Sequence, residues 1–163
     1  MQPRWYALTV KTNLEGSTTS ALRLKGYEAF LPTYRVRNHW SDRVKELDRP
    51  LFPGYTFCLF DALNRLPILI TPGVCSVVGF GNEPAPIDEA EMESVRALVH
   101  SGLPVSPWPF LREGQRIRIV HGAFAGLEGI FIRHKQNCRL VVSISLLQRS
   151  IAAEIDGDWI TPA

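Results

Sequence analysis

The sequence predicts an α+β protein with two modules, in which antiparallel strands and helices come first and a module made only of strands follows. Three observations support this fold class. Strand-like and helical patterns alternate before residue 102, three prolines fall within 104–109, and only short strand-like runs separated by glycines follow residue 111. At 163 residues, the chain is long enough to bury two small cores.

The first module is expected to begin with a strand, because Arg4–Val10 is rich in aromatic and β-branched residues. Asn13 is a suitable N-cap for a helix that ends at Gly26. Ser41 and Asp42 are expected at the tip of a hairpin. The strand-like segments after the helix suit an antiparallel sheet, and they are 27–31, 33–40, 44–47 and 54–60.

A short helix, a strand and a longer helix are expected to complete this module. Residues 63–70 are apolar and contain a proline that suits the first turn of a helix or a kink, whereas 74–80 is rich in β-branched residues. Asp88 is a good N-cap with Glu91 three residues later, so a helix should begin there. We expect this helix to close a first domain that spans 1–102.

A semi-rigid linker is expected at 103–110, because proline lacks the backbone donor that a helix or a central strand needs. The second domain is placed at 111–163. Its β-branched runs are separated by Gly122, Gly126 and Gly129 and predict roughly five short strands. Closure as a small barrel is expected, since it removes exposed strand edges.

Composition indicates a globular protein, with 45% hydrophobic and 21% charged residues. No uninterrupted apolar stretch approaches the roughly 20 residues of a membrane helix, so we expect a cytoplasmic protein without a membrane segment. Cys58, Cys75 and Cys138 are odd in number and irregularly spaced, and we expect them to be buried, reduced thiols.

Patterns typical of catalytic, metal or cofactor sites are missing from the sequence. The cysteines and histidines never pair at the spacing of zinc ligands. A glycine-rich fingerprint that opens at Gly79-Phe80-Gly81 fails, because Pro84 stands where its third glycine would be. No G-x-S-x-G elbow occurs, and each histidine is isolated. We therefore expect a binding protein, not an enzyme, with no cofactor and no metal.

Basic residues concentrate in the N-terminal third. The stretch 4–49 holds nine Lys or Arg against five Asp or Glu, whereas 83–93 holds five acids and no base. This distribution favours the N-terminal third as a face for a polyanion. A solvated surface of mixed charge is the alternative.

The stretch 49–58, RPLFPGYTFC, crowds three aromatic rings around a Pro-Gly turn. Alternation along a strand puts Tyr55 and Phe57 on one face and Thr56 and Cys58 on the other. The small threonine and cysteine suit close packing of a helix on the core side. Tyr55 and Phe57 are therefore expected to face a partner, with burial in the protein's own core as the alternative.

Several motifs follow one another in a fixed order over nearly the whole chain. They are Trp5-Tyr6, Phe30-Leu31-Pro32, Leu51-Phe52-Pro53-Gly54-Tyr55, Thr71-Pro72-Gly73-Val74, Val78-Gly79-Phe80, Gly114-Gln115-Arg116-Ile117-Arg118-Ile119 and Gly122-Ala123-Phe124-Ala125-Gly126-Leu127-Glu128-Gly129. In this order, the motifs resemble the two domains of the NusG family of transcription elongation factors. The resemblance implies an NGN domain, with a four-stranded antiparallel sheet flanked by helices, and a KOW domain with an SH3-like barrel.

The resemblance also implies that the first domain binds the coiled-coil clamp helices of the largest RNA polymerase subunit and so promotes processive elongation. The groove positions carried over from the family are Phe52, Tyr55 and Phe57. Aromatic rings suit this task, because they receive the apolar side chains of a helix at low entropic cost. The family's contact with the opposite polymerase pincer falls on Asn64 and Arg65, where this chain lacks the Thr-rich contact of RfaH.

Lys11 and Arg23 are candidate phosphate contacts to the non-template DNA strand, with a solvated face as the alternative. In the KOW domain, the resemblance places a partner contact at Phe124 and Leu146. Its expected partner is the termination factor Rho or a small-subunit ribosomal protein. The protein is expected to act as a monomer.

Two stretches, WSDRVK at 40–45 and LLQRS at 146–150, look more like specialised regulators of polysaccharide operons, of the RfaH and UpxY kind, than like the housekeeping factor. RfaH can refold its KOW domain into a helical hairpin. The β-branched residues of 117–120 and 141–144 favour a barrel here. The alternative function is that of an RNA-binding ribosome accessory protein, since KOW barrels also occur in ribosomal proteins.

Overall fold

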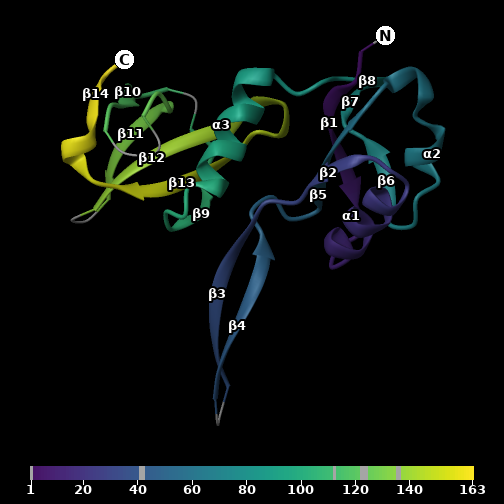
Figure 1. Ribbon diagram of the computed structural model, residues 1–163, viewed down its shortest axis with the longest axis horizontal. Coiled ribbons are helices and arrows are strands. Elements are labelled where there is room, and N and C mark those ends of the chain that lie inside the picture. Colours follow the sequence, from purple (N-terminus) through teal and green to yellow (C-terminus); the bar gives the residue numbers. More distant parts are fainter. Residues whose placement is uncertain (1, 41–42, 112, 122–124, 135–136) are drawn as a thin grey trace. The chain divides into compact units, whose positions relative to one another are not determined.

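A computed structural model describes residues 2–40, 43–111, 113–121, 125–134 and 137–163 (Figure 1). The chain divides into two compact units, Met1–Ile87 and Asp88–Ala163, and each is described by itself. Within the described ranges, no helix is both long enough and apolar enough to cross a membrane.

A four-stranded sheet forms the centre of the first unit. Its order is β2-β5-β1-β6, and every neighbouring pair is antiparallel, as the sequence predicts. The strands are β1 (Arg4–Val10), β2 (Glu28–Phe30), β5 (Tyr55–Phe60) and β6 (Val74–Val77). A separate pair, β7 (Gly79–Phe80) and β8 (Glu83–Pro84), replaces the end of the single strand expected at 74–80.

Helices cover one face of this sheet. They are α1 (Glu15–Leu24) and the short α2 (Leu66–Leu69), which follows a 3-10 turn at Ala62–Asn64. Leu22 of α1 and Ile68 of α2 are fully buried in one cluster with strand residues. The proline of α2 lies in its first turn, as predicted.

The start of α1 differs from the prediction. Asn13 is not the N-cap but adopts a left-handed conformation with φ 69°, one of the few conformations that asparagine tolerates better than most residues. Leu14 takes the N-cap position and makes no side-chain cap hydrogen bond. Asn13 therefore turns the chain into the helix without capping it.

A long two-stranded ribbon extends from the first unit, away from its four-stranded sheet (Figure 1). It consists of β3 (Thr33–Trp40) and β4 (Arg43–Pro50), paired antiparallel along their whole length. The predicted hairpin is thus confirmed, although Ser41 and Asp42 at its expected tip lie outside the described residues.

The second unit contains a six-stranded antiparallel sheet in the order β14-β10-β11-β12-β13-β9. Its strands are β9 (Val105–Trp108), β10 (Gln115–Ile119), β11 (Glu128–His134), β12 (Asn137–Ile144), β13 (Arg149–Ile155) and β14 (Ile160–Pro162). Fully buried aliphatic side chains form its core, including Ile117, Leu140 and Ile151. The C-terminal third is therefore β-rich, as predicted, with strands where a helical hairpin would have helices.

The sixth strand corrects the prediction of a linker at 103–110. Strand β9 pairs with β13, and Pro107 lies opposite Ile151. Because β9 is at the end of the sheet order, its other side needs no donor, and proline is acceptable there. Trp108 adds a cation–π contact, with the guanidinium carbon of Arg139 5.0 Å from its ring centroid.

Helix α3 (Glu89–His100) begins as predicted, since Asp88 Oδ1 accepts a hydrogen bond of 3.0 Å from the backbone N–H of Glu91. It was expected to close the first domain at residue 102. In the structure it belongs to the second unit, where it contacts β12 and hydrogen-bonds to Ser145. The division of the chain thus falls between Ile87 and Asp88, because the helix makes its bonds with the strands that follow it.

Candidate functional site

The alternation predicted for β5 is confirmed. Thr56 Oγ1 lies 2.7 Å from Thr19 Oγ1 of α1, and Cys58 packs in the same cluster as Leu22. Tyr55 must therefore project from the opposite face of the sheet, where Phe57 also lies. Burial raises the pKa of the Cys58 thiol to about 12, so this thiol stays protonated at neutral pH.

The exposure predicted for Phe57 is wrong. Its side chain is fully buried, and so is that of Phe52. The two rings meet edge to face with centroids 5.5 Å apart, and the ring centroid of Phe30 is 6.3 Å from that of Phe57. Tyr55 is half-buried. Alternation shows which face a ring occupies, but aromatic neighbours from other segments determine whether that ring is accessible.

A buried carboxylate fixes the turn that precedes β5. Glu15, at the start of α1, is only 6% exposed, and its Oε2 accepts a hydrogen bond of 3.0 Å from the backbone N–H of Gly54. Gly54 has φ 84°, a conformation that glycine adopts without strain. The turn and the start of β5, with Tyr55, are thereby tied to α1. Sequence reasoning missed this role, although an acid in the first helical turn was a visible signal.

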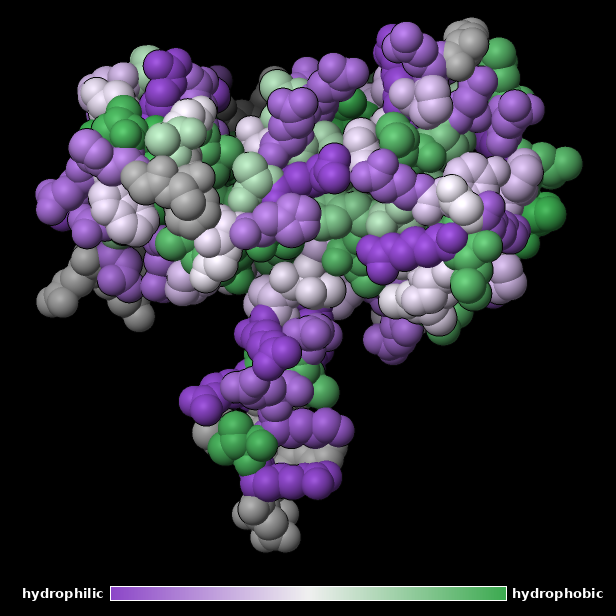
Figure 2. All heavy atoms as spheres, viewed as in Figure 1, coloured by the Kyte–Doolittle hydropathy of each residue, from purple (hydrophilic) through white to green (hydrophobic). Residues whose placement is uncertain are grey.

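The segment around α2 combines polar and apolar groups. Asn64 is exposed, whereas Arg65 is half-buried and donates from Nη1 to the carbonyl oxygen of Ala62 at 2.8 Å. Large apolar side chains beside them are strongly exposed: Leu63 is 68%, Leu66 66% and Ile70 66% exposed. Figure 2 shows green, hydrophobic spheres at the edge of the first unit where Figure 1 labels α2. The sequence had indicated only the polar pair.

Lys11 and Arg23, the two residues predicted to contact phosphates, are both exposed but are not brought together. Lys11 lies before α1 and Arg23 lies near its end, and a helix rises about 1.5 Å per residue, so roughly 12 Å of helix separates them. Arg23 also donates from Nε to the carbonyl oxygen of Ala29 at 3.0 Å. Lys11 and Arg23 therefore do not form a cluster of positive charge.

The two faces of the ribbon differ in charge. On one face, Arg35 contacts Glu46 at 2.8 Å and Asp48 at 3.4 Å, and Arg37 contacts Glu46 at 3.7 Å. This face is close to neutral, and the hydrogen bond that Arg35 donates to the Glu46 carboxylate raises the pKa of Arg35 above its ordinary value.

The register of the two strands places positively charged residues on the other face of the ribbon. There Arg49 lies opposite Tyr34, Lys45 opposite Asn38 and Arg43 opposite Trp40, with no acidic residue among the ribbon positions on that side. Three cations thus share one face with the aromatic residue Tyr34, a combination that suits a nucleic-acid backbone. Sequence reasoning missed this face, because a count of charges over the whole ribbon includes the acids of the neutral face and so hides the positive charge of this one.

In the second unit, Leu146 is half-buried in a 3-10 turn, Ser145–Leu147, that joins β12 to β13. The other predicted partner contact, Phe124, lies outside the described residues. Cys75 in the first unit is exposed, so the expectation of a buried thiol is wrong there, and the described residues contain no cluster of potential metal ligands.

These features define a class of protein in which a small α+β unit, with an aromatic cluster and a cationic ribbon, is followed by a β-rich unit. A family model described as "Transcription termination factor nusG" matches residues 3–96, and the chain belongs to the NusG family of transcription termination and antitermination factors.

Curated relatives support this membership. The chain is 31% identical over 132 residues to the "Transcription termination/antitermination protein NusG" of Lactococcus lactis, which covers 77% of this chain and 70% of the relative. It is 28% identical over 187 residues to the protein of the same name from Thermus thermophilus, with 100% of both covered.

Among solved structures, the chain resembles that described as "Domain interaction in Thermotoga maritima NusG". The TM-score is 0.58 at 18% sequence identity, with 99% of this chain and 98% of that chain covered. This likeness supports the shared fold, and at that identity it carries no conclusion about function.

Proposed function

We propose that this protein binds elongating RNA polymerase through its first unit and recruits a second factor through its β-rich unit. The observation that carries the proposal is the aromatic face of β5. Phe52 and Phe57 form its fully buried base, and the half-buried Tyr55 forms its accessible rim. Such a rim can receive an apolar side chain from the clamp helices of the largest polymerase subunit.

A second polymerase contact is proposed around α2. Asn64 and Arg65 occupy the family's position for it, and Leu63, Leu66 and Ile70 surround them with exposed apolar surface. Large exposed apolar side chains that lie close together are typical of a protein-binding surface. We therefore expect an apolar contact on the opposite pincer, in place of a Thr-rich one.

Nucleic-acid contact is proposed at Lys11 and on the cationic face of the ribbon. Arg43, Lys45 and Arg49 on that face suit phosphates, because a basic face attracts the nucleic-acid backbone without reading its sequence. Arg23 is a weaker candidate, since its Nε already donates to Ala29.

The proposed contact of the β-rich unit is at Leu146, together with Phe124, and the proposed partner is Rho or a small-subunit ribosomal protein. We further propose that the protein acts as a cytoplasmic monomer on particular operons, such as those for polysaccharides. The experiment for recruitment is co-purification of the tagged chain from its own cells. Polymerase in the eluate supports the proposal, whereas ribosomes without polymerase support the accessory role.

The polymerase contact is tested with Tyr55→Ala in a pull-down by a purified clamp-helix fragment. Loss of an aromatic anchor commonly costs about 2 kcal/mol, so binding should weaken roughly 30-fold. Tyr34→Ala, on the ribbon, is the matched control and should bind like the unmutated protein. Equal binding by the Tyr55 variant, with an unchanged melting temperature, would rule out this face as the clamp contact.

A further inference from the structure

The ribbon of β3 and β4 is anchored to the first unit only at its base. Leu51 and Phe52, which follow β4, are buried, and the backbone N–H of Leu51 donates to the carbonyl oxygen of Pro32 at 2.9 Å. Beyond this base, and within the described residues, the two strands pair only with each other. Figure 2 shows mostly hydrophilic spheres on the projecting ribbon, with a few hydrophobic ones among them. A two-stranded ribbon is only marginally stable by itself, so a ligand that covers one face would stabilise it.

The cationic face of the ribbon has an apolar centre. Val36 and Leu47 lie directly opposite each other, and both are half-buried. Alternation puts this pair on the same face as Lys45 and Arg49, which lie on either side of Leu47 along β4. A phosphate backbone offers no apolar group to such a pair. Thymine does, because its methyl group lies in the major groove of a DNA duplex.

The acids of the ribbon determine which face can approach DNA. Glu46 and Asp48 lie on the opposite face, where both contact Arg35. Their carboxylates repel phosphates, whereas the register places no acidic residue on the cationic face. Duplex DNA carries one negative charge per about 1.7 Å of its axis, so it is attracted to the cationic face.

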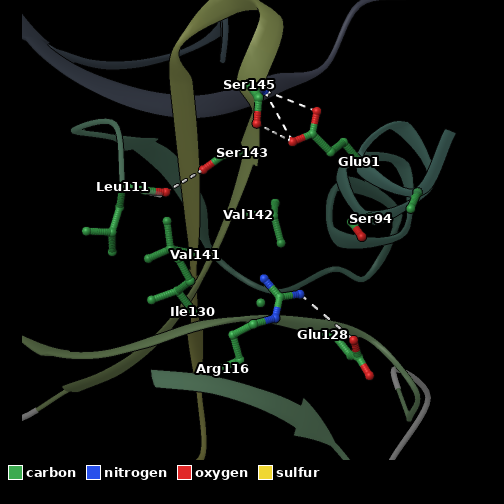
Figure 3. A pocket seen from close by; sticks show the side chains of 12 residues that line it. Glu91, Ser94, Leu111, Arg116, Glu128, Ile130, Val141, Val142, Ser143 and Ser145 are labelled. Carbon is green, nitrogen blue, oxygen red and sulfur yellow. Dashed lines mark hydrogen bonds and ion pairs between the residues drawn. The ribbon is translucent and has the colours of Figure 1, made fainter. Parts of the chain in front are cut away.

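The arginines of the β-rich unit are matched by an acid. Arg116 and Arg118 of β10 both contact Glu128, and the Arg116 ion pair measures 3.9 Å. Figure 3 shows Arg116 joined to Glu128 beside a cavity of about 370 Å³, whose lining includes a second acid, Glu91. This pairing leaves little net positive charge for phosphates. The ribbon is therefore the better site for a polyanion.

The dimensions of the ribbon select one form of nucleic acid. Residues rise about 3.4 Å along an antiparallel strand, so the row from Arg43 to Arg49 spans roughly 20 Å, or about six base pairs of DNA. Two strands about 5 Å apart, with their side chains, fit the major groove of B-form DNA, which is about 12 Å wide and admits a two-stranded ribbon. The major groove of an RNA duplex is too deep and narrow.

We infer that the ribbon enters the major groove of B-form duplex DNA with its cationic face toward the base pairs. The cations of β4 follow one phosphate strand, and the Val36–Leu47 pair contacts thymine methyl groups. The inference rests on the proposed nucleic-acid contact of this face and names its ligand as a DNA duplex.

The test measures binding of the full chain by fluorescence anisotropy to three probes of one mixed sequence. The probes are a DNA duplex of about 20 base pairs, one of its single strands and the matching RNA duplex, and each is longer than the expected site of about six base pairs. We expect the DNA duplex to bind roughly tenfold or more tightly than the other two probes. A preference for either of the others would overturn the inference.

The groove is tested by replacing every thymine of the DNA duplex with uracil. This change removes only methyl groups of the major groove and should weaken binding roughly fourfold, the effect of one buried methyl group. Equal affinity for the thymine and uracil duplexes would overturn insertion into the major groove.

Lys45→Ala with Arg49→Ala should lower the affinity for the DNA duplex roughly tenfold at low salt, because two phosphate contacts are lost. Arg35→Ala with Arg37→Ala is the matched control, since it removes the same charge from the ion-paired face and should cost less affinity. Circular dichroism and melting temperature verify that both variants fold.

Equal losses of affinity in the two double variants would overturn the orientation of the ribbon. Binding that depends on Lys45 and Arg49 with the single strand alone would overturn duplex recognition and leave the proposed nucleic-acid contact intact. Binding that does not depend on them with any probe would refute the proposed contact as well.

Discussion

The carboxylate of Glu15 and the backbone N–H of Gly54 form a hydrogen bond of 3.0 Å that ties the first turn of α1 to the turn before β5. Because Glu15 is buried, its removal leaves a backbone donor without this acceptor. We expect Glu15→Ala to lower the free energy of unfolding by about 1–3 kcal/mol, measured by urea denaturation. Glu15→Gln retains an acceptor oxygen and should lose less. Equal losses in the two variants would contradict this role.

Burial predicts that Phe57 and Tyr55 respond differently to truncation. Phe57→Ala removes a fully buried ring and should destabilise the protein by about 3–5 kcal/mol. Tyr55→Ala removes a half-buried ring and should cost clearly less. Thermal and urea unfolding measure both. A stable Phe57 variant would show that the ring is accessible, as the alternation alone had suggested.

The ribbon predicts that two pairs of basic residues differ in their effect on DNA binding. Lys45→Ala with Arg49→Ala changes the cationic face and should reduce the slope of log affinity against log salt by roughly 2, because each phosphate contact contributes about 0.9. Arg35→Ala with Arg37→Ala removes the same charge from the ion-paired face and should change the slope less. Fluorescence anisotropy on forked DNA at several salt concentrations is the measurement. Equal slopes for the two variants would show that the cationic face is not a specific DNA contact.

Two glycines of the first unit should respond oppositely to alanine. Gly54 has φ 84°, so Gly54→Ala forces a left-handed alanine and should destabilise the protein by about 1–2 kcal/mol. Gly16 lies in α1 with nothing within 4 Å of an added Cβ, so Gly16→Ala should stabilise the protein by about 0.5–1 kcal/mol. Urea unfolding of the two variants decides the signs. Stabilisation by Gly54→Ala would show that the turn is not held in this conformation.

Local sequence patterns were sufficient to predict the features that depend on residues close together in the sequence. The hairpin of the ribbon, the cap at Asp88 and the inward direction of Thr56 and Cys58 all follow from turn chemistry, capping and alternation. Each depends on a few consecutive residues, and each is confirmed.

Features that depend on distant segments could not be predicted in this way. The burial of Phe57 results from Phe30 and Phe52, the strand at Pro107 exists because β13 offers it an edge, and Glu91 bonds to Ser145 across 54 positions of sequence. The cationic face of the ribbon required the register, which composition does not contain.

The three cysteines give the chain a built-in labelling scheme. The thiolate is the reactive form of cysteine, and Cys58, buried with a pKa of about 12, stays unreactive at neutral pH. Cys75 is exposed in the first unit, and Cys138 is partly exposed in the second. Spin labels or fluorophores attached to the unmutated protein would therefore place one probe on each unit. The distance between the two units can then be measured without an engineered cysteine.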